Sequence, residues 1–267
     1  MSNILCIDVG GTKTLLASFD HKGTVIEKIK FPTPQDYTEF IKELTSSVAG
    51  LTTKKFSKCV IAMPAKIDRK AGVAIAFGNL PWHDIPIVSD LERELAIPVV
   101  VENDAKLAGL SEAHLLPNYR KVLYITVSTG IGGVVVINGK IDRNNQDAEY
   151  GHMLLEHDGE LMRWEEFASG KAIVAKFGKR ASDITDPADW YVVARNIALG
   201  LIGVIAATTP NAIVIGGGVG SHFAKYGDRL IEQLKIYEDN LLHVPPVFGA
   251  QRAEEAVIYG CYILANQ

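Results

Sequence analysis

A short motif near the N-terminus has the residue types needed to bind a phosphate and a metal ion. Its sequence is Asp8-Val9-Gly10-Gly11-Thr12-Lys13. Glycines let backbone N–H groups approach phosphate oxygens closely, because no Cβ stands in the way. The Asp8 carboxylate could hold Mg²⁺ directly or through water, while Thr12 and Lys13 add a hydroxyl and a positive charge. Taken alone, the motif is slightly more typical of an ordinary tight hairpin that carries an aspartate.

Two further glycine-rich segments could also approach a phosphate or a nucleotide. One is the turn Ser128-Thr129-Gly130-Ile131-Gly132-Gly133, which adds two hydroxyls to its N–H groups. The other, Gly216-Gly217-Gly218, follows an apolar segment and could let an adenosine lie against the backbone. Each segment alone is typical of a turn. Three of them, two on hairpins at matching places in the chain, favour phosphate binding.

Asp104 is the candidate catalytic residue. It lies between an apolar strand and the start of a helix, where the helix dipole is expected to favour its ionised form. An ionised carboxylate can accept the proton of an attacking hydroxyl during phosphoryl transfer. The alternative is that Asp104, or Asn103 before it, merely caps the helix.

Several polar residues could bind a polyol, which needs donors and acceptors to replace its hydrogen bonds to water. They are Asn79, Glu149, His152 and Glu165. Individually, each is also typical of a solvated surface group or of a hydrogen-bonded core group. His152 and His157 are five residues apart, a spacing that fits no common zinc motif.

The elements that must position these residues follow one pattern used twice. Strands are predicted at 3–7, 15–19, 24–31, 58–63 and 99–101, and helices from 34–36 onward, around 88–95 and at 104–114. The second half repeats it with strands at 122–127, 134–137 and 212–215 and helices at 190–207, 223–234 and 253–264. We therefore predict two similar α/β lobes around a cleft, 1–118 and 119–252, with 253–267 able to join the first.

Composition and charge narrow the class of protein. The 267 residues carry a net charge of −4 and no long basic run, which disfavours nucleic-acid and anionic-membrane binding. Three widely spaced cysteines indicate neither disulfides nor a thiolate zinc site, and we expect them to be buried and reduced. No signal peptide is predicted at residues 1–8, and the apolar run 197–207 is expected to be a buried helix too short to span a bilayer. A cytoplasmic protein is expected.

Together these segments resemble the ROK family (repressors, open reading frames and kinases), sugar kinases of the hexokinase–actin superfamily. The resemblance runs nearly end to end. Its markers are DVGGTK at 8–13, GNLPW at 78–82, PVVVENDA at 98–105, STGIGG at 128–133, EYGHM at 149–153, EEFASG at 165–170, IVIGGG at 213–218 and AEEAVIYG at 253–260.

The resemblance implies an actin-like ATPase (ribonuclease H-like) fold and an ATP- and Mg²⁺-dependent kinase acting on a hexose hydroxyl. Asp104 would be the general base, and the sugar would be bound by Asn79, Asn103, Asp104, Glu149, His152 and Glu165. The turns Gly10–Lys13 and Ser128–Gly132 would bind phosphates, and Gly216–Gly218 the adenosine. It also implies sugar and nucleotide as partners, a homodimer, and closure of the two lobes over both ligands.

One departure from the family pattern concerns zinc. Most members carry a cysteine-rich zinc segment after Gly-His-Met, whereas residues 154–165 contain no cysteine here, so no zinc is expected. Short members without zinc include polyphosphate-dependent glucokinases, which leaves the donor open. A catalytically silent sugar-binding regulator is a second alternative, and another actin-like ATPase is a third. No helix-turn-helix precedes Asp8, which disfavours the repressor branch.

Overall fold

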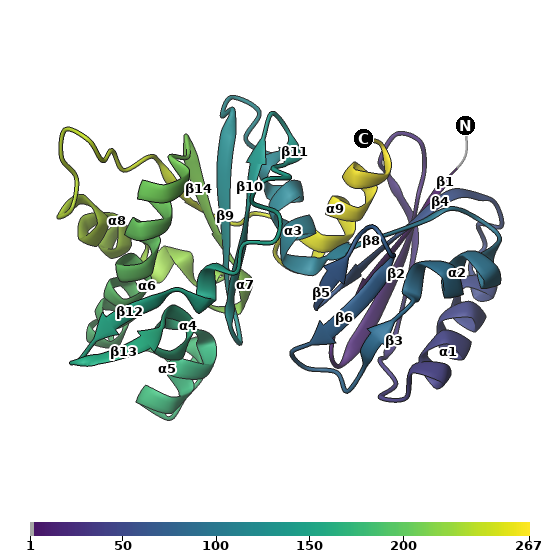
Figure 1. Ribbon diagram of the computed structural model, residues 1–267, viewed down its shortest axis with the longest axis horizontal. Helices are drawn as coiled ribbons and strands as arrows, with labels where there is room; N and C mark the ends of the chain where they lie inside the picture. Colours follow the sequence, from purple (N-terminus) through teal and green to yellow (C-terminus); the bar gives the residue numbers. More distant parts are fainter. Residues whose placement is uncertain (1–2) are drawn as a thin grey trace. The chain divides into compact units, whose positions relative to one another are not determined.

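The computed structural model describes residues 3–267, apart from the side chain of Ala253, and they form two compact units (Figure 1). One unit comprises the described residues up to Ser111 together with Glu254–Gln267, and the other comprises Glu112–Ala253. Each unit has its own hydrophobic core. Residues 1 and 2, where the predicted first lobe begins, lie outside the described part.

The first unit is built on a five-stranded sheet in the order β3-β2-β1-β4-β8. Its strands are β1 (Asn3–Val9), β2 (Lys13–Phe19), β3 (Val25–Pro32), β4 (Phe56–Met63) and β8 (Val99–Asn103). The first three pair antiparallel, and β4 and β8 are added in parallel. The predicted opening meander is confirmed. Asp8 therefore lies at the carboxyl end of a central strand.

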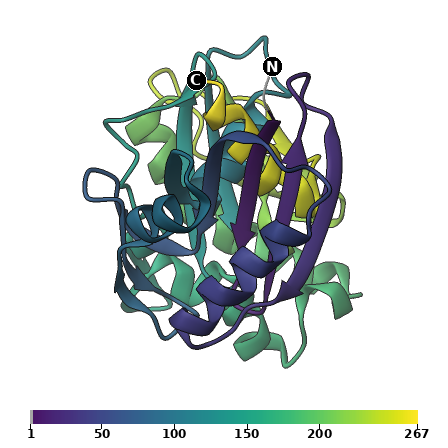
Figure 2. The ribbon, with the colours of Figure 1, turned by 90° about the vertical axis from the view of Figure 1, so that its right-hand side faces the viewer.

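Helices cover both faces of this sheet. Helices α1 (Tyr37–Gly50) and α2 (Ile87–Leu95) lie on one face and α9 (Ala256–Ala265) on the other (Figure 2). Because side chains alternate along a strand, Leu5, Ile7 and Val9 enter the core beside α1, and Asp8 points to the opposite face. Helix α3 (Asp104–Ala113) follows β8 directly, which puts Asp104 at a strand–helix junction as predicted.

The first unit also contains a small three-stranded sheet that was not predicted. Its strands are β5 (Ala65–Asp68), β6 (Val73–Phe77) and β7 (His83–Ile85), paired antiparallel. Asn79 lies in the connection between β6 and β7, so this sheet delivers one of the candidate sugar-binding side chains.

The second unit repeats the strand arrangement of the first. Its sheet has the order β11-β10-β9-β14-β15, formed by β9 (Lys121–Val127), β10 (Ile131–Ile137), β11 (Lys140–Ile141), β14 (Ala212–Gly216) and β15 (Val247–Gly249). As in the first unit, a hairpin is antiparallel and the following strands are parallel. The prediction of one pattern used twice is confirmed.

Helix α6 (Pro187–Thr208) is the central helix of the second core, and the prediction for it needs a correction. The helix has 22 residues and is therefore longer than the apolar run 197–207. Among the described residues, it is the one helix that is long and apolar enough to cross a membrane. Much of its surface is nonetheless buried, including Ile197, Leu201 and Ile205, as expected of a core helix. The earlier start has a local cause: Asp186 caps the helix and Pro187 fits its first turn.

Several shorter elements surround α6. They are the hairpin β12 (Leu154–His157) and β13 (Glu160–Arg163), the helices α4 (Trp164–Ala168), α5 (Gly170–Phe177), α7 (Gly217–Gly220) and α8 (Gly227–Lys235), and the 3₁₀ turns η1 (Tyr150–His152), η2 (Ala181–Asp183), η3 (Phe223–Lys225) and η4 (Ala253–Glu255). Two predicted helices, 223–234 and 253–264, are therefore each divided into a 3₁₀ turn and an α-helix. At Tyr226 the backbone leaves the helical region while the ring stacks on Trp190.

Candidate active site

The turn after Asp8 is held by hydrogen bonds within the first unit. The Gly10 N–H donates to the Lys13 carbonyl over 3.0 Å, the Thr33 N–H donates to the Thr12 carbonyl over 3.0 Å, and the Thr33 hydroxyl donates to the Gly10 carbonyl over 2.7 Å. The Gly10 N–H is thus used inside the turn. The turn is a fixed loop at the end of β1, with Thr12 and Lys13 exposed.

The geometry at the start of α3 separates the two possible roles of Asn103 and Asp104. The Asn103 Oδ1 accepts the Lys106 N–H over 3.2 Å, so Asn103 is the residue that caps the helix. Its amide nitrogen donates to the Ala65 carbonyl over 3.2 Å. The Asp104 carboxylate accepts the neighbouring Ala105 N–H over 2.8 Å. Asp104 is therefore not needed as the cap.

Asp104 and Asp8 both have raised pKa values. At Asp104 this corrects the expectation that the helix dipole would favour the ionised carboxylate. Burial of the carboxyl group raises the pKa of Asp104 from 3.8 to about 6, and the Ala105 N–H only partly offsets this. Burial, and then the charge of Asp104, raise the pKa of Asp8 to about 7, against the lowering effect of Lys30. Both residues keep some exposed surface, but protein surrounds their carboxyl groups. Two carboxyl groups that titrate near neutrality are typical of a catalytic site.

Asn79 lies against the turn that follows Asp8. A Cβ added at Gly11 would come within 2.7 Å of the Asn79 Nδ2 and 2.8 Å of its Cγ. Glycine at position 11 therefore lets the Asn79 amide lie directly on the turn. The structure brings Asn79 to the candidate phosphate loop, a contact that the sequence order alone did not indicate.

In the second unit, Glu165 joins two predicted segments. Its Oε2 accepts the Ile131 N–H over 3.2 Å, and its Oε1 lies 3.5 Å from the His152 Nε2. Gly130 leaves room for this carboxylate, because a Cβ there would lie 2.6 Å from Oε2. Glu149 is exposed just before η1, and its carbonyl oxygen accepts the His152 N–H.

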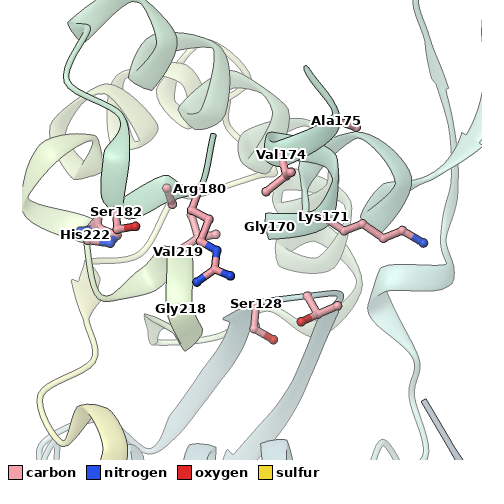
Figure 3. A pocket seen from close by; sticks show the side chains of 12 residues that line it. Ser128, Gly170, Lys171, Val174, Ala175, Arg180, Ser182, Gly218, Val219 and His222 are labelled. Atoms are coloured by element: carbon pink, nitrogen blue, oxygen red, sulfur yellow. The ribbon is translucent and has the colours of Figure 1, made fainter. Parts of the chain in front are cut away.

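A cavity of about 740 Å³ in the second unit is large enough for a nucleotide (Figure 3). It is lined by Ser128, Thr129, Gly170, Lys171, Val174, Ala175, Arg180, Ala181, Ser182, Gly218, Val219 and His222. Figure 3 shows the Arg180 side chain pointing into this space, whereas the Lys171 amino group points away from it. Burial, and then Lys225, lower the pKa of His222, which favours a neutral imidazole.

The glycines of the predicted adenosine segment have different roles. Only Gly218 lines the cavity. Gly216 packs on Tyr124, where a Cβ would lie 2.3 Å from the hydroxyl oxygen, and Gly217 has a φ of +82° that favours glycine. Gly132 pairs with Thr126 inside the sheet, and Gly130 faces Glu165. The first two of the three 216–218 glycines thus shape the strand end.

A sequence comparison decides the family. The sequence profile of the ROK family matches residues 4–267. The chain belongs to the ROK family. The curated glucokinase of Streptomyces coelicolor is 26% identical over 98% of this chain and 96% of that protein.

Solved structures of similar proteins agree with the fold. The ROK hexokinase of Thermus thermophilus is 27% identical, covers 99% of both chains and has a TM-score of 0.82. The inorganic polyphosphate/ATP-glucomannokinase of an Arthrobacter strain is 27% identical, covers 100% of both chains and has a TM-score of 0.74. The predicted actin-like fold class is confirmed by this ROK membership and by these neighbours.

Only part of the cavity lining of this ROK chain was predicted from its sequence. Ser128, Thr129 and Gly218 were predicted, whereas the cations Lys171 and Arg180 were not. Lys171 directly follows the EEFASG motif, so its position held a usable signal, but Arg180, Ser182 and His222 lie in no motif.

Metal ligands and thiols are the remaining candidate site residues within residues 3–267. No cluster of three or more His, Cys, Asp or Glu side chains suited to a metal occurs in this part of the ROK chain. All three cysteines are free and buried, as predicted. His157 stacks on Phe167 with ring centroids 4.2 Å apart, which gives it a packing role.

Proposed function

We propose that this protein transfers the γ-phosphoryl group of ATP to a hydroxyl of a hexose, the 6-hydroxyl of glucose or of a related sugar. The observation that carries this proposal is Asp104. Asn103 caps the helix, which leaves the Asp104 carboxylate available for chemistry. The pKa of Asp104, about 6, lies close to the pH at which a general base works best. An ionised Asp104 would take the proton of the sugar hydroxyl as the phosphoryl group is transferred.

The donor side of the proposal rests on the cavity of the second unit. Its apolar wall, which includes Val174 and Val219, suits an adenine ring, while the Ser128 and Thr129 hydroxyls suit phosphate oxygens. Mg²⁺ often uses only one or two protein carboxylates together with the substrate phosphates, so Asp8 fits the role of its ligand. The ion would supply positive charge that neutralises the transferred phosphoryl group.

We assign the sugar hydroxyls to two sets of side chains. In the first unit these are Asn79, Asn103 and Asp104, and the Asn103 amide has one N–H left after its bond to Ala65. In the second unit they are Glu149, His152 and Glu165, of which the last two already lie 3.5 Å apart. On the resemblance to ROK kinases we further propose a cytoplasmic homodimer. We also propose two lobes, 1–118 joined by 253–267 and 119–252, whose boundaries fall a few residues from those of the two compact units.

Polyphosphate is the second candidate donor, and the Arg180 guanidinium at the cavity favours it. Arg180 points into the space, and a chain of phosphates needs such positive charge along its path. The apolar wall argues for the nucleotide, because polyphosphate has no apolar part to bury there.

The experiment is a coupled assay of the purified protein with Mg²⁺. ATP and polyphosphate are each crossed with glucose, mannose, fructose, allose and two N-acetylhexosamines. We expect turnover with ATP and one or two hexoses. Turnover with polyphosphate alone would reassign the donor. A protein that binds a hexose in calorimetry but turns over with neither donor would be a regulator.

The pH dependence of kcat/KM is a first prediction. Asp104 has to be ionised to accept a proton, so activity should fall as the pH drops through about 6. An ordinary aspartate would lose activity only near pH 4. The measurement is a pH–rate profile from pH 5 to 9 at saturating Mg²⁺. Full activity retained at pH 5 would contradict the assignment.

A second prediction concerns Gly11. In Gly11→Ala the new methyl group would displace the Asn79 amide, which lies 2.7 Å from the added Cβ. We expect the KM for sugar to rise about tenfold, since a small displacement of a substrate-positioning group has large effects. Gly78→Ala is the matched control, because a Cβ at Gly78 meets no described heavy atom within 4 Å. Equal KM values for the two variants would remove Asn79 from the sugar site.

A further inference from the structure

Asn196, on helix α6, is a buried polar residue that contacts three residues of one neighbouring segment. Its side-chain nitrogen donates to the Phe167 carbonyl over 2.8 Å, and its Oδ1 lies 3.4 Å from the His157 Nε2. Its own carbonyl oxygen accepts the Trp164 Nε1–H over 3.1 Å. We call Asn196, His157, Trp164 and Phe167 the Asn196 cluster. A buried amide holds its partners in place, because leaving any of them unpaired is costly.

Ring packing tightens the Asn196 cluster. The His157 imidazole stacks on Phe167 with an interplanar angle of 14°. The Trp164 indole lies on α6 at Gly200, one turn after Asn196, where a Cβ would come within 2.2 Å of the ring. Glycine at position 200 thus allows α4 to lie directly on α6. The hairpin β12–β13 supplies His157, so it also contacts α6 at Asn196.

The Asn196 cluster fixes the backbone around Glu165. Trp164 and Phe167 lie on either side of Glu165 in α4, a helix of five residues, so fixing both fixes the carboxylate between them. Glu165 in turn accepts the Ile131 N–H and lies beside the His152 imidazole. A continuous chain of contacts therefore runs from Asn196 through α4 to His152.

We propose that Asn196 is a positioning residue for sugar binding. Its side chain acts through Phe167 and His157, and its backbone carbonyl through Trp164, to hold Glu165 and His152 in the geometry that binds the sugar. Asn196 does not itself touch the substrate. This inference rests on the proposed function, in which Glu165 and His152 bind the sugar. It assigns sugar affinity to a residue of the buried core helix.

The test compares Asn196→Leu with Gly203→Ala on the same helix. Asn196→Leu keeps the approximate size of the side chain and removes its polar groups. A Cβ at Gly203 meets no described heavy atom within 4 Å, which makes it a matched control. We expect Asn196→Leu to weaken sugar binding about tenfold, in both KM and the calorimetric Kd. The Kd for ATP should stay within about twofold of the wild-type value, because the lining of the nucleotide cavity does not include Asn196. Equal losses for sugar and ATP would reduce Asn196 to a folding role and overturn the proposal.

A milder variant covers the case in which Asn196→Leu does not fold. His157→Phe keeps a ring to stack on Phe167 and removes the contact to Asn196. We expect it to weaken sugar binding about threefold, and adding it to Asn196→Leu should cause little further loss, since the two act through one contact. Unchanged sugar affinity in His157→Phe, or independent additive losses, would overturn the proposal. A wild-type protein that binds no hexose in calorimetry would instead overturn the proposed function itself.

Discussion

Asp104→Asn is expected to lower kcat by about two to four orders of magnitude, the usual contribution of a general base. Asparagine has nearly the same shape and can still accept the Ala105 N–H through its side-chain oxygen, so the start of α3 should be preserved. Because Asn103 caps the helix, the fold should not depend on the Asp104 charge. The measurements are kcat with sugar and ATP, and the sugar Kd by calorimetry, which should stay within a few-fold of the wild-type value.

Asp228→Asn provides the control for Asp104. Asp228 is also in the first turn of its helix, α8, but it is exposed. Its replacement should leave kcat unchanged, because a surface aspartate at a helix start affects stability by only a small amount. If Asp104→Asn kept more than about a tenth of the wild-type kcat, another residue would have to be the base.

Asp8→Asn should abolish turnover and at the same time stabilise the free protein at alkaline pH. A carboxyl group whose pKa is raised by folding contributes stability below its unfolded pKa of 3.8, and that contribution is lost as the pH rises through about 7. Asparagine avoids the cost of burying the charge. At pH 8 we expect a gain of about 1 to 3 kcal/mol in the free energy of unfolding. This is less than the free energy equivalent of the whole pKa shift, because Asp8 is partly exposed to solvent.

The pH dependence of unfolding supplies the control for Asp8. The stabilisation of Asp8→Asn over wild type should be smaller at pH 5 than at pH 8, because the cost of Asp8 to the wild-type fold grows as the pH rises from its unfolded pKa of 3.8 to about 7. Kinase activity should be lost at both pH values, since the neutral amide is a poor ligand for Mg²⁺. A variant less stable than wild type at pH 8 would show that Asp8 has a stabilising partner.

The parts of the fold that depend on local signals were predictable. The β1–β2 hairpin follows from an apolar strand and a glycine turn, and the repetition of that pattern at β9–β10 indicated two similar units. The β5–β6–β7 sheet was missed because its strands are only three to five residues long, too short for alternation to be recognised. The early start of α6 was signalled by Asp186-Pro187, a capping residue followed by proline, and could have been recognised.

The candidate site was predictable where its residues form motifs, and not where folding gathers isolated side chains. Asp104 was found at its strand–helix junction, but its raised pKa depends on burial, which sequence order does not report. The contacts of Glu165 with Ile131 and His152 join three segments that only the fold brings together. Arg180 and His222 reach the cavity from separate segments and carry no motif.

Phosphoryl transfer from ATP to the sugar can be followed directly by ³¹P NMR. Purified protein is incubated with ATP and Mg²⁺, with and without the hexose that gives turnover in the coupled assay. We expect a sugar phosphomonoester signal to grow together with ADP, only when the hexose is present, and not in Asp104→Asn. Release of inorganic phosphate at the same rate without sugar would contradict it and would indicate an ATPase that does not phosphorylate sugars.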